Sequence, residues 1–355
     1  MQHNSLSGAG VDHSVLFSAS EAYYRSAVLE LRRTLLVDDV VRVGPDAGIV
    51  VLRTGDIRDV HEAAEANRLR FIRHLAAVAE IAPSDKLHGD PDRIADFVLS
   101  LELPWASDGV AVQVWESGKT PASPEAVRKA VTTALRSKRI DTLRSGGNQV
   151  LSICIGERQT VAALNASRWA LSDWPGGRMR LATLPEQISR AEFKLEELFR
   201  LHGVRSGDVG LDLGASPGGW TRILRRHGYA RVHAVDPADL DASLLADPGV
   251  VYHRTTAGEF LKTTPEHFDI VVNDMRMVPE LSAQVMVDAA ARLRPGAYGV
   301  FTLKLDAPDA VNQVDRAIKI FGARFELEFA RQLQHNRHEL TVVGRIPTRR
   351  RRSGP

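Results

Sequence analysis

From residue 189 onward, short apolar runs rich in β-branched residues alternate with stretches of helical character. The apolar runs cover residues 209–213, 231–235, 250–253, 268–273 and 298–303, and residues 324–333 and 340–346 are expected to form a final pair of strands. Strands that alternate with helices favour an α/β fold with a mostly parallel, doubly wound sheet of the Rossmann-like type. Such sheets bind ligands beyond the carboxyl ends of their strands, where the strand order reverses. Functional residues are therefore expected at strand ends.

A glycine-rich loop follows the first of these strands and precedes a helix. It consists of Gly214, Ala215, Ser216, Pro217, Gly218, Gly219 and Trp220. Glycines at such a junction let the backbone approach a ligand closely. Asp236 ends the next strand, about twenty residues on, where an acid accepts hydrogen bonds from ribose hydroxyls. A glycine-rich loop alone is often only a tight turn, but strand, helix and acid together predict a ligand site.

Two further features of this junction bear on the ligand. The loop lacks the G-x-G-x-x-G spacing, which disfavours a nicotinamide dinucleotide. Asp212 lies within the strand, where it is expected either to orient the loop or contact a ligand amino group, or to have a purely structural role.

The motif LDLGASPGGW resembles the S-adenosylmethionine-binding signature of the FtsJ-like ribose 2′-O-methyltransferases. SRAEFKLEELF, VVNDM, VFTLKL and HELTVVGR match further motifs of that family in the same order. The resemblance is closest to the ribosomal RNA large subunit methyltransferase M family, through RQLQHNRHELTV and SDWPGGRMRL, and is strongest over residues 189–345. That family methylates a cytidine ribose of 23S rRNA.

The resemblance implies a cofactor, a partner and a domain order. The implied cofactor is S-adenosylmethionine, held by the loop, Asp212, Asp236 and Asp274. The implied partner is RNA, expected to be 23S rRNA. No DNA partner, membrane association or metal site is predicted. The expected domain order is a flexible N-terminus (1–13), a ferredoxin-like α+β module (14–83), a THUMP-like RNA-binding module (84–182), the methyltransferase domain (183–347) and a basic flexible tail (348–355). The oligomeric state stays open.

The family's Lys-Asp-Lys-Glu tetrad falls on Lys194, Asp274, Lys304 and Glu339. Methyl transfer to a 2′-hydroxyl requires a group that takes the hydroxyl proton as the new bond forms. A lysine can do so only in its neutral form, which burial and a second cation favour. Lys304 is therefore expected to handle the proton, Lys194 and Asp274 to tune its charge and orient the ribose, and Glu339 to hold a lysine in place.

Each tetrad residue also has a plain structural interpretation. Lys194 could be a solvated helix lysine, Asp274 could cap the next segment, and Glu339 could pair with Arg337 at the surface. Lys304 fits such an interpretation least well, because charges seldom end a buried strand without a role. Four matches in order favour the catalytic interpretation.

One position departs from the family pattern. The acid that usually follows the third strand and meets the adenine amino group is replaced by Ala257 or displaced to Glu259 in the stretch TTAGE. Adenine recognition is then expected to depend more on backbone groups.

The first half of the chain contains no catalytic set and is expected to be an RNA-binding platform. Helices are expected over residues 20–36, over most of 57–80 with Asp56 as its cap, and over 123–136; strands are expected at 40–43, 48–52, 110–115, 149–155 and 160–164. Basic residues suited to the RNA backbone are Lys119, Lys129, Lys138, Arg178 and Arg180. Trp174 is expected to pack at the domain junction rather than to stack on a base.

Composition leaves several function classes open. A net charge of +2 does not by itself indicate a nucleic-acid binder, and the basic run 349–352 is either a solvated end or a phosphate contact. The single cysteine, Cys154, excludes a disulfide framework and fits a core position in a cytoplasmic protein. Alternatives to 23S rRNA methylation are ribose methylation of tRNA or another rRNA site, and a non-catalytic RNA-binding assembly factor.

Overall fold

The computed structural model describes residues 13–204 and 206–348, and the predicted N-terminal segment and basic tail lie almost wholly outside these residues. The chain forms two compact units that divide between Met179 and Arg180. Among the described residues, no helix is both long and apolar enough to span a membrane. Short 3₁₀ helices occur at Glu21–Tyr23, Ser167–Trp169, Pro175–Gly177, Ala290–Arg292 and Ala307–Asp309.

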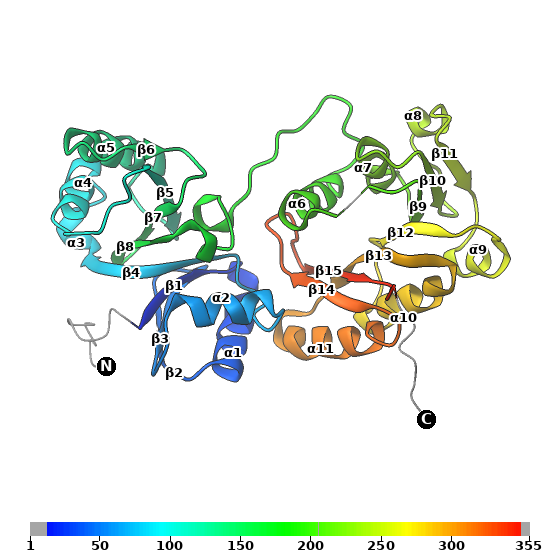
Figure 1. Cartoon of the computed structure of the whole chain (residues 1–355), viewed down its shortest axis with the longest axis horizontal. Coiled ribbons are helices and arrows are strands. Elements are labelled where there is room, and N and C mark those ends of the chain that lie inside the picture. The colour runs from blue at the N-terminus through cyan, green and yellow to red at the C-terminus, as the bar shows by residue number, and fades with distance from the viewer. Residues whose placement is uncertain (1–12, 205, 349–355) are drawn as a thin grey trace. The chain divides into compact units, whose positions relative to one another are not determined.

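The first unit begins with a β-α-β-β-α-β series, the element order of a ferredoxin-like unit. Its elements are β1 (Ser14–Ser18), α1 (Tyr24–Thr34), β2 (Val37–Arg42), β3 (Ala47–Leu52), α2 (Ile57–Glu65) and β4 (His74–Pro83), with antiparallel pairing in the order β2-β3-β1-β4 (Figure 1). A buried ion pair between Arg70 and Glu30, with 2.7 Å between Nε and Oε1, joins α1 to the segment before β4.

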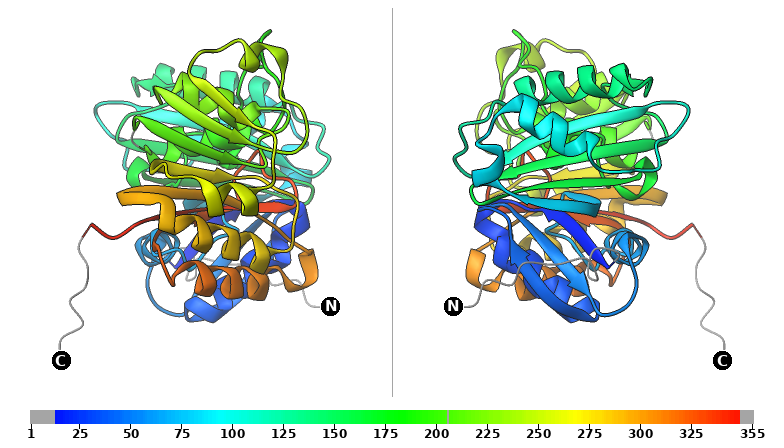
Figure 2. Two further views of the ribbon diagram at one scale, coloured as in Figure 1. Left: turned by 90° about the vertical axis from the view of Figure 1, so that its right-hand side faces the viewer. Right: turned by 90° about the vertical axis from the view of Figure 1, so that its left-hand side faces the viewer.

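The remaining elements of this unit extend the same sheet. They are α3 (Ser84–Leu87), α4 (Pro91–Leu99), β5 (Val110–Ser117), α5 (Pro124–Ser137), β6 (Thr142–Leu143), β7 (Gln149–Gly156) and β8 (Gln159–Ala166), and the sheet continues from β4 as β8-β7-β5-β6. Helices α4 and α5 cover one face of these strands and share an apolar core with them (Figure 2). Cys154 is buried, as expected. The predicted division at residue 83 falls at the end of β4; the module boundaries and the THUMP-like assignment stay predictions.

The expected helix over most of residues 57–80 is wrong in its second half. Asp56 does cap α2 in a capping box, but the helix ends at Glu65 and residues from His74 form strand β4. The alanines, leucine and glutamate of β4 favour a helix when considered alone. Strand β4 pairs with β1 on one side and β8 on the other, and this pairing overrides the local preference.

The second unit is a seven-stranded sheet with helices on both faces. Its elements are α6 (Glu192–His202), β9 (Val209–Leu213), α7 (Gly219–Arg226), β10 (Arg231–Val235), α8 (Ala242–Leu245), β11 (Val250–His253), α9 (Ala257–Thr263), β12 (Phe268–Asn273), α10 (Pro279–Ala289), β13 (Leu293–Lys304), α11 (Ala310–Phe321), β14 (Glu326–Arg331) and β15 (Glu339–Arg345). Helices α6 and α7 lie on one face, and α10 and α11 lie on the other (Figure 1).

The strand order, β11-β10-β9-β12-β13-β15-β14, confirms the predicted doubly wound sheet. Strands β9 to β13 are parallel, and β15 runs antiparallel to both of its neighbours. The order reverses between β9 and β12, and the ligand site of such a sheet lies at the carboxyl ends of these two strands. The predicted glycine loop, Asp236, Asp274 and Lys304 all lie at strand ends on this edge.

Candidate active site at the carboxyl edge of the sheet

The glycine loop after β9 is shaped by two positions that only glycine fits. Gly214 has a φ of 74°, and a Cβ there would lie 2.1 Å from Cγ of Met275. Gly218 has a φ of 117°, which L-residues rarely adopt, and a Cβ there would lie 2.0 Å from a methyl group of Leu244. The loop therefore lies directly against the segment that follows β12.

Asp236 fixes the loop from the end of β10. Its carboxylate accepts hydrogen bonds from the backbone N–H groups of Ser216, at 3.1 Å, and Ala238, at 2.8 Å. The Ser216 hydroxyl donates to the carbonyl of Asp239 at 2.8 Å. Ala215 is buried, whereas Pro217 is exposed.

Trp220 is placed in the core rather than at the ligand side of the loop. Its side chain is 3% exposed and its Nε1–H donates to the carbonyl of Ala191 at 2.8 Å. Gly219, next to it, lies so close to Ser189 that a Cβ would be 2.2 Å from the Ser189 hydroxyl. The start of α7 is thus joined to the start of α6, and only the backbone of Trp220 remains available to a cofactor.

Asp212 is a buried acid beneath the loop. Its carboxylate accepts a hydrogen bond from the Thr221 hydroxyl at 2.7 Å. Burial raises the pKa of Asp212 to about 7, and the nearby carboxylates of Asp274 and Asp236 add to this. Among the described residues, no lysine or arginine forms an ion pair with Asp212 or Asp236. Asp212 and Asp236, two acids without a cation of their own, suit a ligand that carries positive charge.

The structure brings the four predicted tetrad residues into one cluster. Nζ of Lys194 lies 3.0 Å from Oδ2 of Asp274 and 3.0 Å from Oε1 of Glu339. Nζ of Lys304 lies 2.5 Å from Oδ1 of Asp274 and 3.5 Å from Oε1 of Glu339. Lys304 and Glu339 are opposite each other across the β13–β15 pair. The strand register therefore sets one side of the cluster, and α6 supplies Lys194.

The electrostatics of the cluster keep its carboxylates ionised. Burial opposes charge on Asp274 and Glu339, but the two lysines outweigh it and lower the pKa of both acids. Burial also opposes charge on Lys194, but Asp274 and Glu339 outweigh it and raise the pKa of this lysine. Lys194 is therefore a fixed cation, and it is not the solvated helix lysine of the plain interpretation.

The other plain interpretations are also set aside by the contacts. Asp274 accepts hydrogen bonds from both lysines and from the Thr302 hydroxyl, at 2.6 Å. Glu339 accepts the backbone N–H of Arg337 at 2.8 Å and ion-pairs with the lysines instead of the Arg337 guanidinium.

Three residues that sequence reasoning missed hold this arrangement. Thr302 bridges Lys304 and Asp274. Glu192, 3% exposed, binds the Arg222 guanidinium of α7 at 2.6 Å and the backbone N–H of Ile188 at 2.7 Å. Glu197, 2% exposed, accepts backbone N–H groups of the β14–β15 loop. Both glutamates lie in the sequence SRAEFKLEELF, where they are indistinguishable from ordinary helix surface charges.

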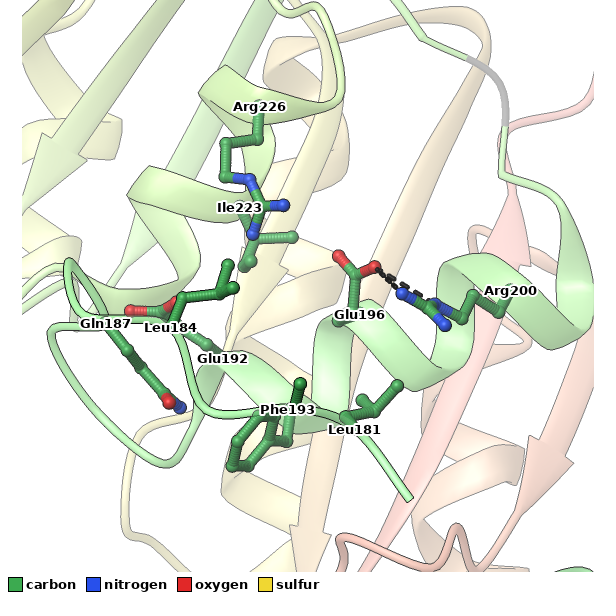
Figure 3. Close-up of a pocket in the computed structure, with 10 residues that line it drawn as sticks. Leu181, Leu184, Gln187, Glu192, Phe193, Glu196, Arg200, Ile223 and Arg226 are labelled. Atoms are coloured by element: carbon green, nitrogen blue, oxygen red, sulfur yellow. Dashed lines mark hydrogen bonds and ion pairs between the residues drawn. The ribbon is translucent and has the colours of Figure 1, made fainter. Parts of the chain in front are cut away.

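A small cavity of about 140 Å³ lies between residues 181–187, α6 and α7 (Figure 3). It is lined by Phe193, Ile223 and Arg226, by leucines of the preceding segment, and by Glu196, which pairs with Arg200. None of its lining residues belongs to the glycine loop or the tetrad, so this cavity is separate from the candidate active site.

The stretch after β11 does not bring an acid to the sheet edge. Thr256 caps α9 by accepting the backbone N–H of Glu259, and the Glu259 carboxylate pairs with Lys262 at the surface, at 2.9 Å. The displaced acid considered from the sequence is thus turned toward its own helix.

The predicted RNA contacts of the first half divide into two groups. Lys119, Lys129, Lys138 and Arg180 are exposed. Arg178 instead ion-pairs with Asp46 at 2.5 Å and donates to the carbonyl of Glu116 at 2.7 Å, and it is therefore a structural tie within the first unit. An RNA role for the four exposed residues stays a prediction.

Comparison with known proteins gives a consistent result. Residues 187–337 match the model of the FtsJ-like methyltransferase family. The ribosomal RNA large subunit methyltransferase M of Xanthomonas oryzae pv. oryzae is 31% identical over 304 residues, which cover 79% of this chain and 85% of that protein. The protein of the same name from Hahella chejuensis is 28% identical over 330 residues, covering 85% and 81%. The crystal structure of TrmN from Thermus thermophilus, 16% identical, aligns over 94% of this chain and 100% of that one with a TM-score of 0.39, a likeness too weak to support a conclusion.

Proposed function

The chain belongs to the ribosomal RNA large subunit methyltransferase M family, and from this premise we propose that it methylates the ribose 2′-hydroxyl of a cytidine in 23S rRNA. The cofactor of this family is S-adenosylmethionine. The observation that carries the proposal is the cluster of Lys194, Asp274, Lys304 and Glu339 beside the glycine loop, with every lysine within 3.5 Å of a carboxylate.

The residues at the strand ends fit this cofactor. When bound, S-adenosylmethionine supplies a methyl group on a positively charged sulfonium. Asp236 would accept hydrogen bonds from its ribose, because each carboxylate oxygen that holds the loop retains a second lone pair. Burial is the main cause of the raised pKa of Asp212, and the carboxylates of Asp274 and Asp236 add to it; a cationic ligand would favour the ionised form of this acid.

Lys304 is the residue that we assign to the hydroxyl proton. As the new carbon–oxygen bond forms, the 2′-hydroxyl must lose its proton to a neutral amine. Lys194 is unsuited to this, because Asp274 and Glu339 both stabilise its charged form. Lys304 ends β13 at the carboxyl edge of the sheet, and its side chain is 21% exposed against 12% for Lys194, so its amine is the more open of the two to a substrate hydroxyl. Asp274 then orients both amines, and alignment of the reacting atoms contributes most of the rate.

The test is methyl transfer from radiolabelled S-adenosylmethionine to in vitro transcribed 23S rRNA. Replacing Lys304 by alanine is expected to lower kcat by about 100-fold or more, the usual contribution of a proton acceptor, while cofactor affinity is kept. The matched control is Lys319→Ala, an exposed lysine of α11, which is expected to behave as the wild type. A Lys304→Ala enzyme that retains a near-normal rate contradicts the assignment.

The wild-type protein tests the wider proposal in the same assay with total cellular RNA as the acceptor. The label is expected at a single cytidine, mapped by resistance of the next phosphodiester to alkali. Label in tRNA or at another rRNA site refutes the 23S rRNA cytidine. Cofactor binding without any transfer refutes the enzymatic function and favours an RNA-binding assembly factor.

A further inference from the structure

Two exposed arginines lie close in sequence to two different residues of the tetrad. Arg276 is two residues after Asp274, and Arg337 is two residues before Glu339. Within the described part of the chain, neither guanidinium has an acidic partner. This distinguishes them from Arg222 and Arg316, which pair with glutamates of the same unit.

Arg337 lies on a loop that is held rigidly although it is at the surface. The buried Glu197 of α6 accepts the backbone N–H groups of Gln334 and His335, each at 2.9 Å. The buried Asn336 side chain accepts the backbone N–H of Leu333 at 2.8 Å and the Thr341 hydroxyl at 3.1 Å. Together with the bond from the Arg337 backbone N–H to Glu339, these contacts fix the backbone of the β14–β15 loop at residue 337 before any ligand binds.

Arg276 lies on a segment that is fixed in a similar way. The buried Asn273 side chain accepts the backbone N–H of Met275 at 2.9 Å. Met275 in turn packs against Gly214, where there is no room for a Cβ. The next residue, Arg276, is therefore presented to solvent from a rigid support beside Asp274.

We propose that Arg276 and Arg337 bind the phosphates on either side of the acceptor nucleotide and thereby place its 2′-hydroxyl at the tetrad. Asp274 and Glu339 meet at Lys194, whose Nζ lies 3.0 Å from a carboxylate oxygen of each, so the two arginines adjoin one cluster from two different strands, β12 and β15. The tetrad sets two ionised acids against its two lysines and thus carries no net positive charge to attract RNA. Arginine provides both charge and a planar fork for phosphate oxygens.

This inference rests on the proposed function, since it takes RNA as the substrate. The ligand is the phosphodiester backbone and not a base, because contacts of this kind position RNA without reading its sequence. Rigid supports favour accurate placement of a reacting group over loose electrostatic attraction.

The test uses the full chain with Arg276→Ala, Arg337→Ala and the corresponding lysine variants, with 23S rRNA as the probe. Each alanine variant is expected to raise the RNA KM about 10-fold, the scale of one charged hydrogen bond, with the cofactor dissociation constant unchanged. The slope of log affinity against log salt concentration should fall by about 0.7 for each phosphate of single-stranded RNA that is no longer neutralised. The lysine variants should retain the salt slope because they keep the charge.

Arg324→Ala is the matched control. Arg324 is exposed and lies just before β14. The first residue of β14 is opposite Arg345, which is at the far end of β15 from Glu339. Its replacement should change neither the RNA KM nor the salt slope. An active wild type combined with unchanged KM and salt slope in Arg276→Ala and Arg337→Ala overturns the inference, as does a lysine variant that behaves like alanine. Failure of the proposed function is distinguished by an inactive wild type.

Discussion

Replacing Asp274 by asparagine probes the charge cluster most directly, because this carboxylate contacts both lysines. Its contacts at 3.0 and 2.5 Å are each worth about 6 kcal/mol at an effective dielectric constant of about 20. Desolvation of the carboxylate and the remaining attraction of both lysines to Glu339 offset most of this. Removing one partner of a buried ion pair costs about 3–5 kcal/mol. The tetrad side chains are 12–21% exposed and thus only partly buried, so the cost is expected toward the lower end of this range.

The assay is differential scanning calorimetry of the full chain, following the transition that S-adenosylmethionine shifts upward. For a unit of this size a loss of 1 kcal/mol lowers Tm by about 2–4 °C, so Asp274→Asn should lower Tm by about 6–20 °C at pH 7. Asp288→Asn, at an exposed residue of α10, is the matched control and should stay within about 0.5 kcal/mol of the wild type.

The pH dependence of this difference follows from the sign of each shift. The pKa of Asp274 is below its ordinary 3.8, so its stabilisation is complete above that pH and is lost as the pH falls through the lowered value. The pKa of Lys194 is above its ordinary 10.5, so its contribution is complete below that pH and is lost only as the pH rises through the raised value. The difference in Tm between the wild type and Asp274→Asn should therefore have its full size between about pH 4 and pH 10. An Asp274→Asn protein that melts with the wild type at pH 7 refutes the coupling described for the cluster.

Two further predictions concern the glycine loop. Trp220→Phe removes the donor to the partly buried carbonyl of Ala191, which should destabilise the second unit by about 1 kcal/mol and raise the dissociation constant of S-adenosylmethionine. An unchanged melting temperature and an unchanged dissociation constant would show that the loop does not depend on this link to the start of α6. Gly218→Ala places a side chain at a φ of 117°, so the loop should distort at a cost of about 1–3 kcal/mol and bind the cofactor at least several-fold more weakly. Unaltered cofactor binding in isothermal titration calorimetry would mean that the loop tolerates alanine in this conformation.

Local patterns predicted those parts of the fold in which neighbouring residues carry the information. The alternation of apolar runs and helices in the second unit predicted every strand of the sheet. Inner strands such as β10 and β12 are almost wholly buried, so each leaves a nearly continuous apolar run in the sequence. The same local approach failed at β4. Its composition favours a helix, and only pairing with β1 and β8 makes it a strand.

The sequence by itself determined the loop, the acid that follows β10 and, through family resemblance, the identity of the four tetrad residues. Only the tertiary structure decided that Lys194 shares two carboxylates, since Asp274 is 80 residues away and Glu339 is 145 residues away. It also decided that Trp220 packs inward and that Arg178 is a structural tie. The physical reason is that the charge state and direction of a side chain depend on groups that chain folding brings within a few ångströms, and these groups leave no local pattern around the residue itself.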